Sequence, residues 1–376
     1  MTDRFVFVLE QTLGHVAHAR NIQRALSEEQ SIRPTLIKLS FEHHPPALKV
    51  VPGGGNWSLR ASAAARSALR RRLAEGAVDA LFVHTQVASL LSVGVMRRVP
   101  TVLSLDATPK NFDDVGLAYR HRRQARPVEW FKASINRRPL HAAQAIVTWS
   151  ELAARSVASD YGVDRSRVSV IRPGVDLELF RPAPRVVSAD GMRLLFVGGD
   201  FVRKGGPDLL EAMRALPHSV QLDVVTGSRV LGVPAGVTCR VHGGLRPGDP
   251  RLLELYRAAD VFVLPSRGDC LPQVLAEAAA SALPIVAADT GAVSEIVKPG
   301  ATGLLVPQGA PRELASALRF LLDNPRLRAA LGQESLSLAR AEHDAGRNNR
   351  RIFELMRRLS RAARPLAAAA TAAVAP

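Results

Sequence analysis

Residues 261–289, VFVLPSRGDCLPQVLAEAAASALPIVAAD, contain a short apolar run, a polar loop, an Ala-rich helical stretch and a second apolar run. Short, continuous runs rich in β-branched residues and separated by helices are typical of parallel strands covered on both faces. Pro272 is expected to open the helix, because proline is tolerated in a first helical turn. The stretch therefore predicts one β-α-β unit of a parallel sheet.

The same alternation extends in both directions from this stretch. Further strands are expected at FVFVLE (5–10), TLIKLS (35–40), ALFVHT (80–85), TVLSLD (101–106), AIVTWS (145–150), RLLFVGG (193–199), QLDVVTG (221–227) and TGLLVP (302–307). The proline-rich stretch 181–191 has no periodicity and is predicted to be an interdomain linker. We therefore predict an α/β fold of two Rossmann-like, doubly wound domains, residues 1–182 and 183–342, facing a central cleft where nucleotide ligands bind.

The composition agrees with a soluble two-domain protein. A chain of 376 residues exceeds what one core normally supports. No signal peptide or membrane-spanning run is visible, and the two cysteines, Cys239 and Cys270, suit a reducing cytosol, so we expect a cytoplasmic protein. The net charge of +16 is spread over both halves and attracts anions. A GC-rich genome is an alternative source of the many Arg and Ala residues.

Residues 196–212, FVGGDFVRKGGPDLLEA, have the composition of a phosphate-binding loop. Gly198 and Gly199 allow a sharp turn and close approach of a ligand. Arg203 and Lys204 precede the N-terminus of a helix, where unpaired N–H groups attract a diphosphate. The alternative is an ordinary helix start with two solvated cations. The spacing is not G-x-G-x-x-G, which argues against a dinucleotide dehydrogenase.

Two carboxylates in the opening stretch suit sugar recognition. Asp269 follows a strand, and Glu277 lies about 7.5 Å along the next helix from Pro272, at about 1.5 Å per residue. Separated in this way, Asp269 can bind hydroxyls of a transferred hexose while Glu277 binds the ribose of a nucleoside diphosphate. The alternative makes Asp269 a helix cap and Glu277 a surface residue, but the Leu and Ala neighbours of Glu277 are unusual for a solvated carboxylate.

With these residues in hand, the chain resembles the retaining glycosyltransferases of family 4, also called group 1, which have the GT-B fold. The resemblance covers nearly the whole chain: the Glu-x7-Glu motif corresponds to DCLPQVLAE (269–277), and EAAASALPIV, TGLLVP, YGVDRSRVSVIRPGVDLELF and FLLDNPRLRAALG also match family passages. It implies an acceptor-binding N-terminal domain, a donor-binding C-terminal domain, and a last helix, about 343–365, that returns to the N-terminal domain.

The sequence also departs from the family pattern. Asp269 replaces the first motif Glu, and Cys270, Leu271 and Pro272 replace Gly-Phe-Gly, which puts the donor sugar in doubt more than the activity. Gly199 occupies a position that is often Arg. In the N-terminal half, Leu105 replaces a His that many members have, although Asp106 is retained.

The early glycine loop of the family corresponds to Gly14 and His15. The resemblance places this loop beside the donor phosphates and the acceptor. A lone histidine is more often a surface or capping residue, so the alternative for His15 is a purely structural role.

The resemblance implies transfer of a hexose with retention of configuration, from a UDP- or GDP-linked donor to a glycan, glycolipid or small-molecule hydroxyl. Arg203 and Lys204 would stabilise the leaving diphosphate. No D-x-D motif is present, and no obligatory metal or other cofactor is expected. The alternatives are a sugar-nucleotide epimerase and a basic nucleic-acid-binding protein; the low aromatic content of 5% argues against the latter, and no nucleic-acid partner is expected.

A basic segment suggests one further partner. Residues 119–138, YRHRRQARPVEWFKASINRR, carry seven basic residues around Trp130 and Phe131. Basic residues around exposed aromatics are typical of surfaces that dock on anionic lipid. The sequence thus predicts peripheral contact with an anionic membrane on its inner face; the alternative is that the two aromatics pack inside the domain.

Overall fold

The structure is a computed structural model that describes residues 2–12, 14–40, 56–119, 125–183 and 191–372, without the side chains of 117 and 364–372. Contacts divide the chain into two units. Unit 1 contains residues 1–110, 123–172 and 346–376, and unit 2 contains residues 111–122 and 173–345. The stretch 181–191 lies within unit 2, and its residues 184–190 are outside the described ones.

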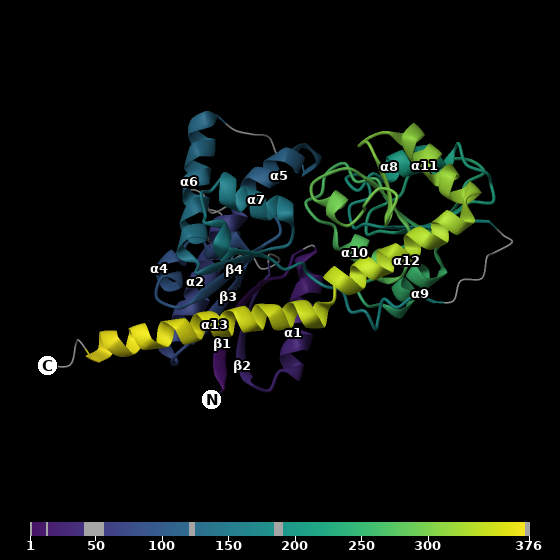
Figure 1. Cartoon of the computed structure of the whole chain (residues 1–376). Helices are drawn as coiled ribbons and strands as arrows, with labels where there is room; N and C mark the ends of the chain where they lie inside the picture. The colour runs from purple at the N-terminus through teal and green to yellow at the C-terminus, as the bar shows by residue number, and fades with distance from the viewer. Residues whose placement is uncertain (1, 13, 41–55, 120–124, 184–190, 373–376) are drawn as a thin grey trace. The chain divides into compact units, whose positions relative to one another are not determined.

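Unit 1 is built on a six-stranded parallel sheet of order β2-β1-β3-β4-β5-β6 (Figure 1). Its strands are β1 (Asp3–Glu10), β2 (Ile32–Leu39), β3 (Ala80–His84), β4 (Thr101–Leu105), β5 (Ala145–Thr148) and β6 (Val168–Val170). Its helices are α1 (His15–Glu28), α2 (Trp57–Ala74), α3 (Gln86–Ser89), α4 (Val93–Met96), α6 (Arg126–Ala142), α7 (Glu151–Ser159), the short η3 (Arg165–Arg167) and the long α13 (Ala345–Ala372), whose first residue belongs to unit 2.

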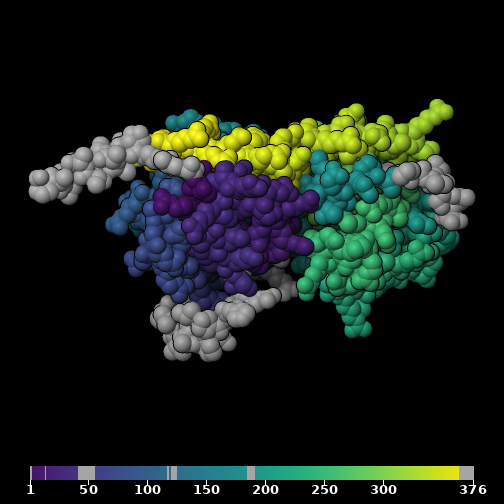
Figure 2. Space-filling view, turned by 90° about the horizontal axis from the view of Figure 1, so that it is seen from below, coloured from purple at the N-terminus to yellow at the C-terminus, as the bar shows by residue number. Residues whose placement is uncertain are grey.

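The two faces of this sheet are covered by different helices. Leu69 of α2 and Leu140 of α6 pack with residues of one face. On the other face, Ile22 of α1 and Phe353 of α13 pack with Phe5 and Phe7. The resulting contact of α13 with the N-terminal residues is visible in Figure 2, where the yellow helix lies along the purple surface. Residues at the two ends of the sequence therefore share one core.

Unit 2 repeats the plan with the sheet order β12-β11-β10-β7-β8-β9. Its strands are β7 (Arg193–Val197), β8 (Gln221–Val225), β9 (Thr238–His242), β10 (Val261–Leu264), β11 (Ile285–Ala288) and β12 (Gly303–Val306). The helices are α8 (Gly206–Met213), α9 (Pro250–Ala258), α10 (Gln273–Ala280), α11 (Pro311–Asp323) and α12 (Pro325–Glu342), with the short η4 (Val293–Glu295). Unit 2 also includes most of α5 (Pro109–Val115) and all of η2 (Gly116–Tyr119).

The predicted α/β class and every predicted strand are confirmed. Two strands, β6 and β9, were not predicted. β6 has only three residues, and β9 is an edge strand in which every residue keeps some exposure, so neither has the continuous apolar run of a buried strand. Among the described residues, no helix is both long and apolar enough to cross a bilayer.

Candidate active site

The cations and carboxylate predicted for the donor site meet because their strands are neighbours. β7 and β10 are adjacent and parallel in the sheet of unit 2. Their carboxyl ends therefore lie at the same edge. The loop after β7 carries Arg203 and Lys204, and the loop after β10 carries Asp269.

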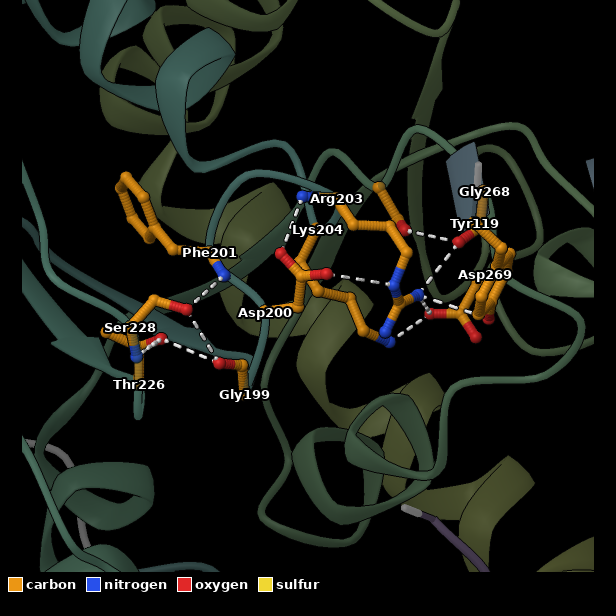
Figure 3. Close-up of polar contacts among 11 residues, drawn as sticks. Tyr119, Gly199, Asp200, Phe201, Arg203, Lys204, Thr226, Ser228, Gly268 and Asp269 are labelled. Carbon is orange, nitrogen blue, oxygen red and sulfur yellow. Dashed lines mark hydrogen bonds and ion pairs between the residues drawn. The ribbon is translucent and has the colours of Figure 1, made fainter. Parts of the chain in front are cut away.

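Asp269 is the centre of this cluster (Figure 3). Lys204 Nζ donates a hydrogen bond to Asp269 Oδ2, and Arg203 Nη1 lies 3.9 Å from the same oxygen. All three side chains are largely buried, which strengthens their electrostatic interaction. The two cations, Arg203 and Lys204, thus meet at Asp269, and Arg203 Nε also lies 3.5 Å from Oδ2 of the more exposed Asp200.

The glycines of the loop play different roles. A Cβ on Gly198 would lie 2.9 Å from Lys204 Cγ, whereas a Cβ on Gly199 would meet nothing within 4 Å. Gly198 therefore makes room for Lys204, and Gly199 leaves open space. The left-handed residue of the turn is Gly205, with φ of 80°. Pro207 lies in the first turn of α8.

Two hydroxyl residues that the sequence analysis missed hold the glycine loop. The carbonyl of Gly199 accepts hydrogen bonds from Thr226 Oγ1 at 3.3 Å and Ser228 Oγ at 3.0 Å. Ser228 Oγ also accepts from the N–H of Phe201 at 3.2 Å. Both side chains follow β8, the strand next to β7, and this placement at a shared sheet edge was the signal that could have identified them.

Glu277 is only 5% exposed, so it is no surface residue. Pro272 caps α10 as predicted, and the helix directs Glu277 inward, where Glu277 Oε2 accepts a hydrogen bond of 2.8 Å from the hydroxyl of Tyr256. Burial raises the pKa of Glu277 to about 7, and the Tyr256 hydrogen bond partly offsets that rise. Tyr256 was not predicted from the sequence. Its ring stacks on Phe262 with 5.8 Å between centroids.

The motif residues between Asp269 and the helix are also buried. Cys270 is 9% and Leu271 6% exposed. The carbonyl of Cys270 accepts a hydrogen bond of 2.8 Å from the N–H of Ala292. Neither Cys270 nor Cys239 forms a disulfide. Burial of Cys270 and Leu271 and the hydrogen bond from Ala292 therefore hold the loop on the C-terminal side of Asp269.

In unit 1, two predicted residues come together at the carboxyl edge of the sheet. Gly14 caps α1, and His15 begins it. His15 Nε2 lies 3.9 Å from Asp106 Oδ2 and 3.9 Å from Glu10 Oε1. Glu10 ends β1, and its other oxygen accepts a hydrogen bond of 2.8 Å from the hydroxyl of Thr85. Glu10 was not predicted as a site residue, although it lies at the end of the predicted strand 5–10.

Two further histidines, also missed, support His15. His15 Nδ1 lies 3.1 Å from Nε2 of His84, which ends β3, and the rings of His15, His18 and His84 all lie against Trp149. Burial lowers the pKa of His18 to about 3 and that of His84 well below its usual value. His18 and His84 are therefore neutral near pH 7. The edge presents carboxylate oxygens, which accept hydrogen bonds from hydroxyl groups.

No group of three or more His, Cys, Asp or Glu side chains that could hold a metal ion occurs in the part of the chain that the structure describes.

Two family models match successive parts of the chain. Residues 14–179 match Glycosyltransferase Family 4, and residues 191–324 match glycosyl transferases group 1. These two matches cover most of unit 1 and most of unit 2, in that order.

Relatives with curated names are D-inositol 3-phosphate glycosyltransferases. The protein from Kineococcus radiotolerans is 37% identical over 232 residues, which are 51% of this chain and 52% of the relative. The protein from Thermomonospora curvata is 32% identical over 218 residues, which are 50% of this chain and 51% of the relative. The chain thus spans about half the length of the curated relatives it matches.

Solved structures show the same fold at lower identity. Sucrose-phosphate synthase from Thermosynechococcus elongatus superposes with a TM-score of 0.76 at 18% identity, over 96% of this chain and 100% of that one. Anabaena HepE, solved in complex with UDP, superposes with a TM-score of 0.66 at 17% identity, over 94% of this chain and 99% of that one. The fold is GT-B.

Proposed function

Because the chain belongs to the group 1 glycosyltransferases of family 4, we propose that it transfers a hexose from a nucleoside-diphosphate sugar to an acceptor hydroxyl, with retention of configuration. The observation that carries this proposal is the cluster of Arg203, Lys204 and Asp269 at the carboxyl edge of the unit 2 sheet. Two adjacent cations beside an open glycine loop suit a diphosphate, and one carboxylate suits the hydroxyls of a sugar.

The donor is proposed to be UDP-linked, with a GDP-linked sugar as the alternative. HepE has been solved with UDP and with UDP-glucose, and it shares the fold of this chain. Arg203 and Lys204 would bind the diphosphate, Asp269 the hexose and Glu277 the ribose. Gly198, Gly199, Cys270, Leu271 and Pro272 would shape the loops around these groups.

For the acceptor, we propose a polyhydroxylated molecule, and a cyclitol phosphate is the first to test because the relatives are named for D-inositol 3-phosphate. His15 with Asp106 and Glu10 would bind its hydroxyl groups, since carboxylates accept hydrogen bonds from vicinal hydroxyls. A phosphate on the acceptor would be attracted by the net charge of +16. Glycans and glycolipids are the other acceptor classes.

In the proposed reaction, the bond between the anomeric carbon and the diphosphate oxygen breaks, and its electron pair leaves with the diphosphate. The acceptor oxygen attacks the same face of the sugar, and its proton passes to the departing phosphate. Arg203 and Lys204 stabilise the charge that develops on the leaving group. The positive charge comes from the chain itself, so the proposal requires no metal ion.

The test is a transfer assay combined with binding measurements. Thermal unfolding is measured with UDP, GDP, ADP, TDP and CMP, because a ligand that binds only the folded state raises the midpoint. UDP-glucose is then incubated with and without myo-inositol 3-phosphate, and the products are examined by NMR. Acceptor-dependent release of UDP with an α-linked product supports the proposal. An epimerised donor, or no stabilisation by any nucleoside diphosphate, contradicts it.

We also propose that unit 1 contacts an anionic membrane surface through α6, on the inner face of the membrane. Trp130 is 73% exposed and Phe131 59%, so the aromatics do not pack inside the unit. Arg126 and Arg137 are exposed and recur with Trp130 at four- and seven-residue intervals, which places the three on one helix face. Arg120, Arg122 and Arg123 of the predicted segment lie outside the described residues.

A further inference from the structure

A short segment from the first half of the sequence is part of unit 2. Residues 111–122 group with unit 2, although the chain before and after them belongs to unit 1. The described part of this segment contains the end of α5 and all of η2, which closes on Tyr119. The ring of Tyr119 lies 4.8 Å from that of Phe112, centroid to centroid, so the two ends of the segment pack on each other.

Tyr119 contacts Arg203 in two ways (Figure 3). The guanidinium carbon of Arg203 lies 4.4 Å from the centroid of the Tyr119 ring, which is the geometry of a cation–π contact. Arg203 Nη1 also donates to the Tyr119 hydroxyl at 3.1 Å and to the carbonyl of Gly268 at 3.0 Å. The Arg203 side chain is only 11% exposed, so these contacts are poorly screened by solvent.

These contacts use one end of the guanidinium. Both N–H groups of Nη1 are engaged, and Nε lies 3.5 Å from Asp200 Oδ2. Nη2 donates no hydrogen bond to another described residue, so its N–H groups can donate to phosphate oxygens. Arg203 is thus held through Nη1 and Nε, while Nη2 can bind a phosphate oxygen.

The loop that carries Asp269 is shaped to receive the same segment. A Cβ on Gly268 would lie 2.4 Å from Ala118 Cβ and 2.8 Å from the carbonyl oxygen of Val115. Only glycine at 268 permits this approach. Gly268 directly precedes Asp269. The segment therefore contacts both Arg203 and the loop that carries Asp269.

We infer that Tyr119 is a positioning residue of the donor site, which holds Arg203 in place for the diphosphate of the donor. The inference rests on the proposed function. An unrestrained arginine loses side-chain entropy when it binds a phosphate, and a side chain already held in place avoids that cost. Tyr119 acts through Arg203 and makes no contact with substrate itself.

The test is a double-mutant cycle on UDP binding, measured by calorimetry. Tyr119→Phe keeps the ring and removes the hydroxyl, and we expect the Kd for UDP to rise about fivefold, as for loss of one ordinary hydrogen bond. Tyr119→Leu also removes the ring, and we expect a rise of about tenfold or more. Because uridine has no phosphate, its Kd, measured by competition, is expected to stay constant in both variants.

The second arm of the cycle uses Arg203→Ala. In that background, Tyr119→Phe is expected to change the Kd for UDP by less than about twofold, because its target is gone. Tyr161→Phe, which removes a buried tyrosine hydroxyl in unit 1, serves as the control and is expected to leave UDP binding unchanged.

The outcomes separate the inference from the function on which it rests. If Arg203→Ala leaves UDP binding unchanged, the diphosphate is bound elsewhere, and both the proposed donor site and the role of Tyr119 are overturned. If Arg203→Ala weakens binding but Tyr119→Phe and Tyr119→Leu do not, only the role of Tyr119 is overturned. An equal loss from Tyr119→Phe in both backgrounds, or an equal loss of uridine affinity, overturns it as well.

Discussion

At the scale of single residues, the buried carboxyl group of Glu277 accepts a hydrogen bond from the hydroxyl of Tyr256. A carboxylate can accept further hydrogen bonds, and the two hydroxyls of a ribose would supply them. We expect Glu277→Gln to fold and to reduce transfer by at least about tenfold, roughly 1.4 kcal/mol, because an amide accepts on only one atom. Steady-state kinetics test this against Glu211→Gln, an exposed helix position, as control. Wild-type kinetics in a folded Glu277→Gln variant would remove Glu277 from the site.

The raised pKa of Glu277 also predicts how stability depends on pH. Burial raises it from 4.5 to about 7, so the folded state holds a proton that the unfolded state releases between these values. The stabilisation is complete below about pH 4.5 and is lost as pH rises through about 7, a change on the order of 3 kcal/mol. Urea unfolding followed by circular dichroism should show this fall in the wild type and in Glu211→Gln, and a flatter profile in Glu277→Gln. Parallel profiles in all three proteins would place the titration elsewhere.

At the scale of secondary-structure elements, α6 carries the membrane proposal. Trp130→Ser combined with Phe131→Ser removes its two most exposed aromatics. We expect the wild type to co-sediment with phosphatidylglycerol vesicles but not with phosphatidylcholine vesicles, and to dissociate as salt rises. The double variant should bind about tenfold more weakly. Trp57→Ser, an exposed tryptophan of α2, is the control. Equal binding to both vesicle types, no binding at low salt, or an equal loss in the control would exclude the α6 surface.

Elements differ in how well the sequence predicts them. β10, α10 and β11 were predictable because continuous β-branched runs and a proline at the helix start are local signals. β9 was not, since TCRVH has no such run and its pairing with β8 is set by the sheet. Within the site, Arg203, Lys204 and Asp269 were visible as motif residues. Tyr119 and Tyr256 were not, because their contacts span 84 and 21 residues of sequence, and no local pattern encodes such pairings.

At the scale of the whole molecule, α13 ties the end of the chain into unit 1. Phe353 is 1% exposed and meets Phe7 edge to face at 5.9 Å. We expect Phe353→Ala to destabilise unit 1 by about 3–5 kcal/mol, whereas Phe320→Ala, 47% exposed on α11, should change stability by less than about 0.5 kcal/mol. All three tryptophans lie in unit 1, so tryptophan fluorescence in urea reports the unfolding of that unit alone. An unchanged midpoint for Phe353→Ala would show that α13 does not stabilise unit 1.

The position of α13 also has a consequence for synthesis on the ribosome. The sheet of unit 2 is complete in sequence once Val306 has been made, but the core of unit 1 still lacks Ile352, Phe353 and Met356 at that point. Domains that are continuous in sequence fold in the order in which they leave the ribosome. In this chain the order of completion is reversed: until α13 has been made, α1 covers that face of the unit 1 sheet without its second helix. During that interval the apolar surface that α13 later covers is exposed, which favours binding by a chaperone.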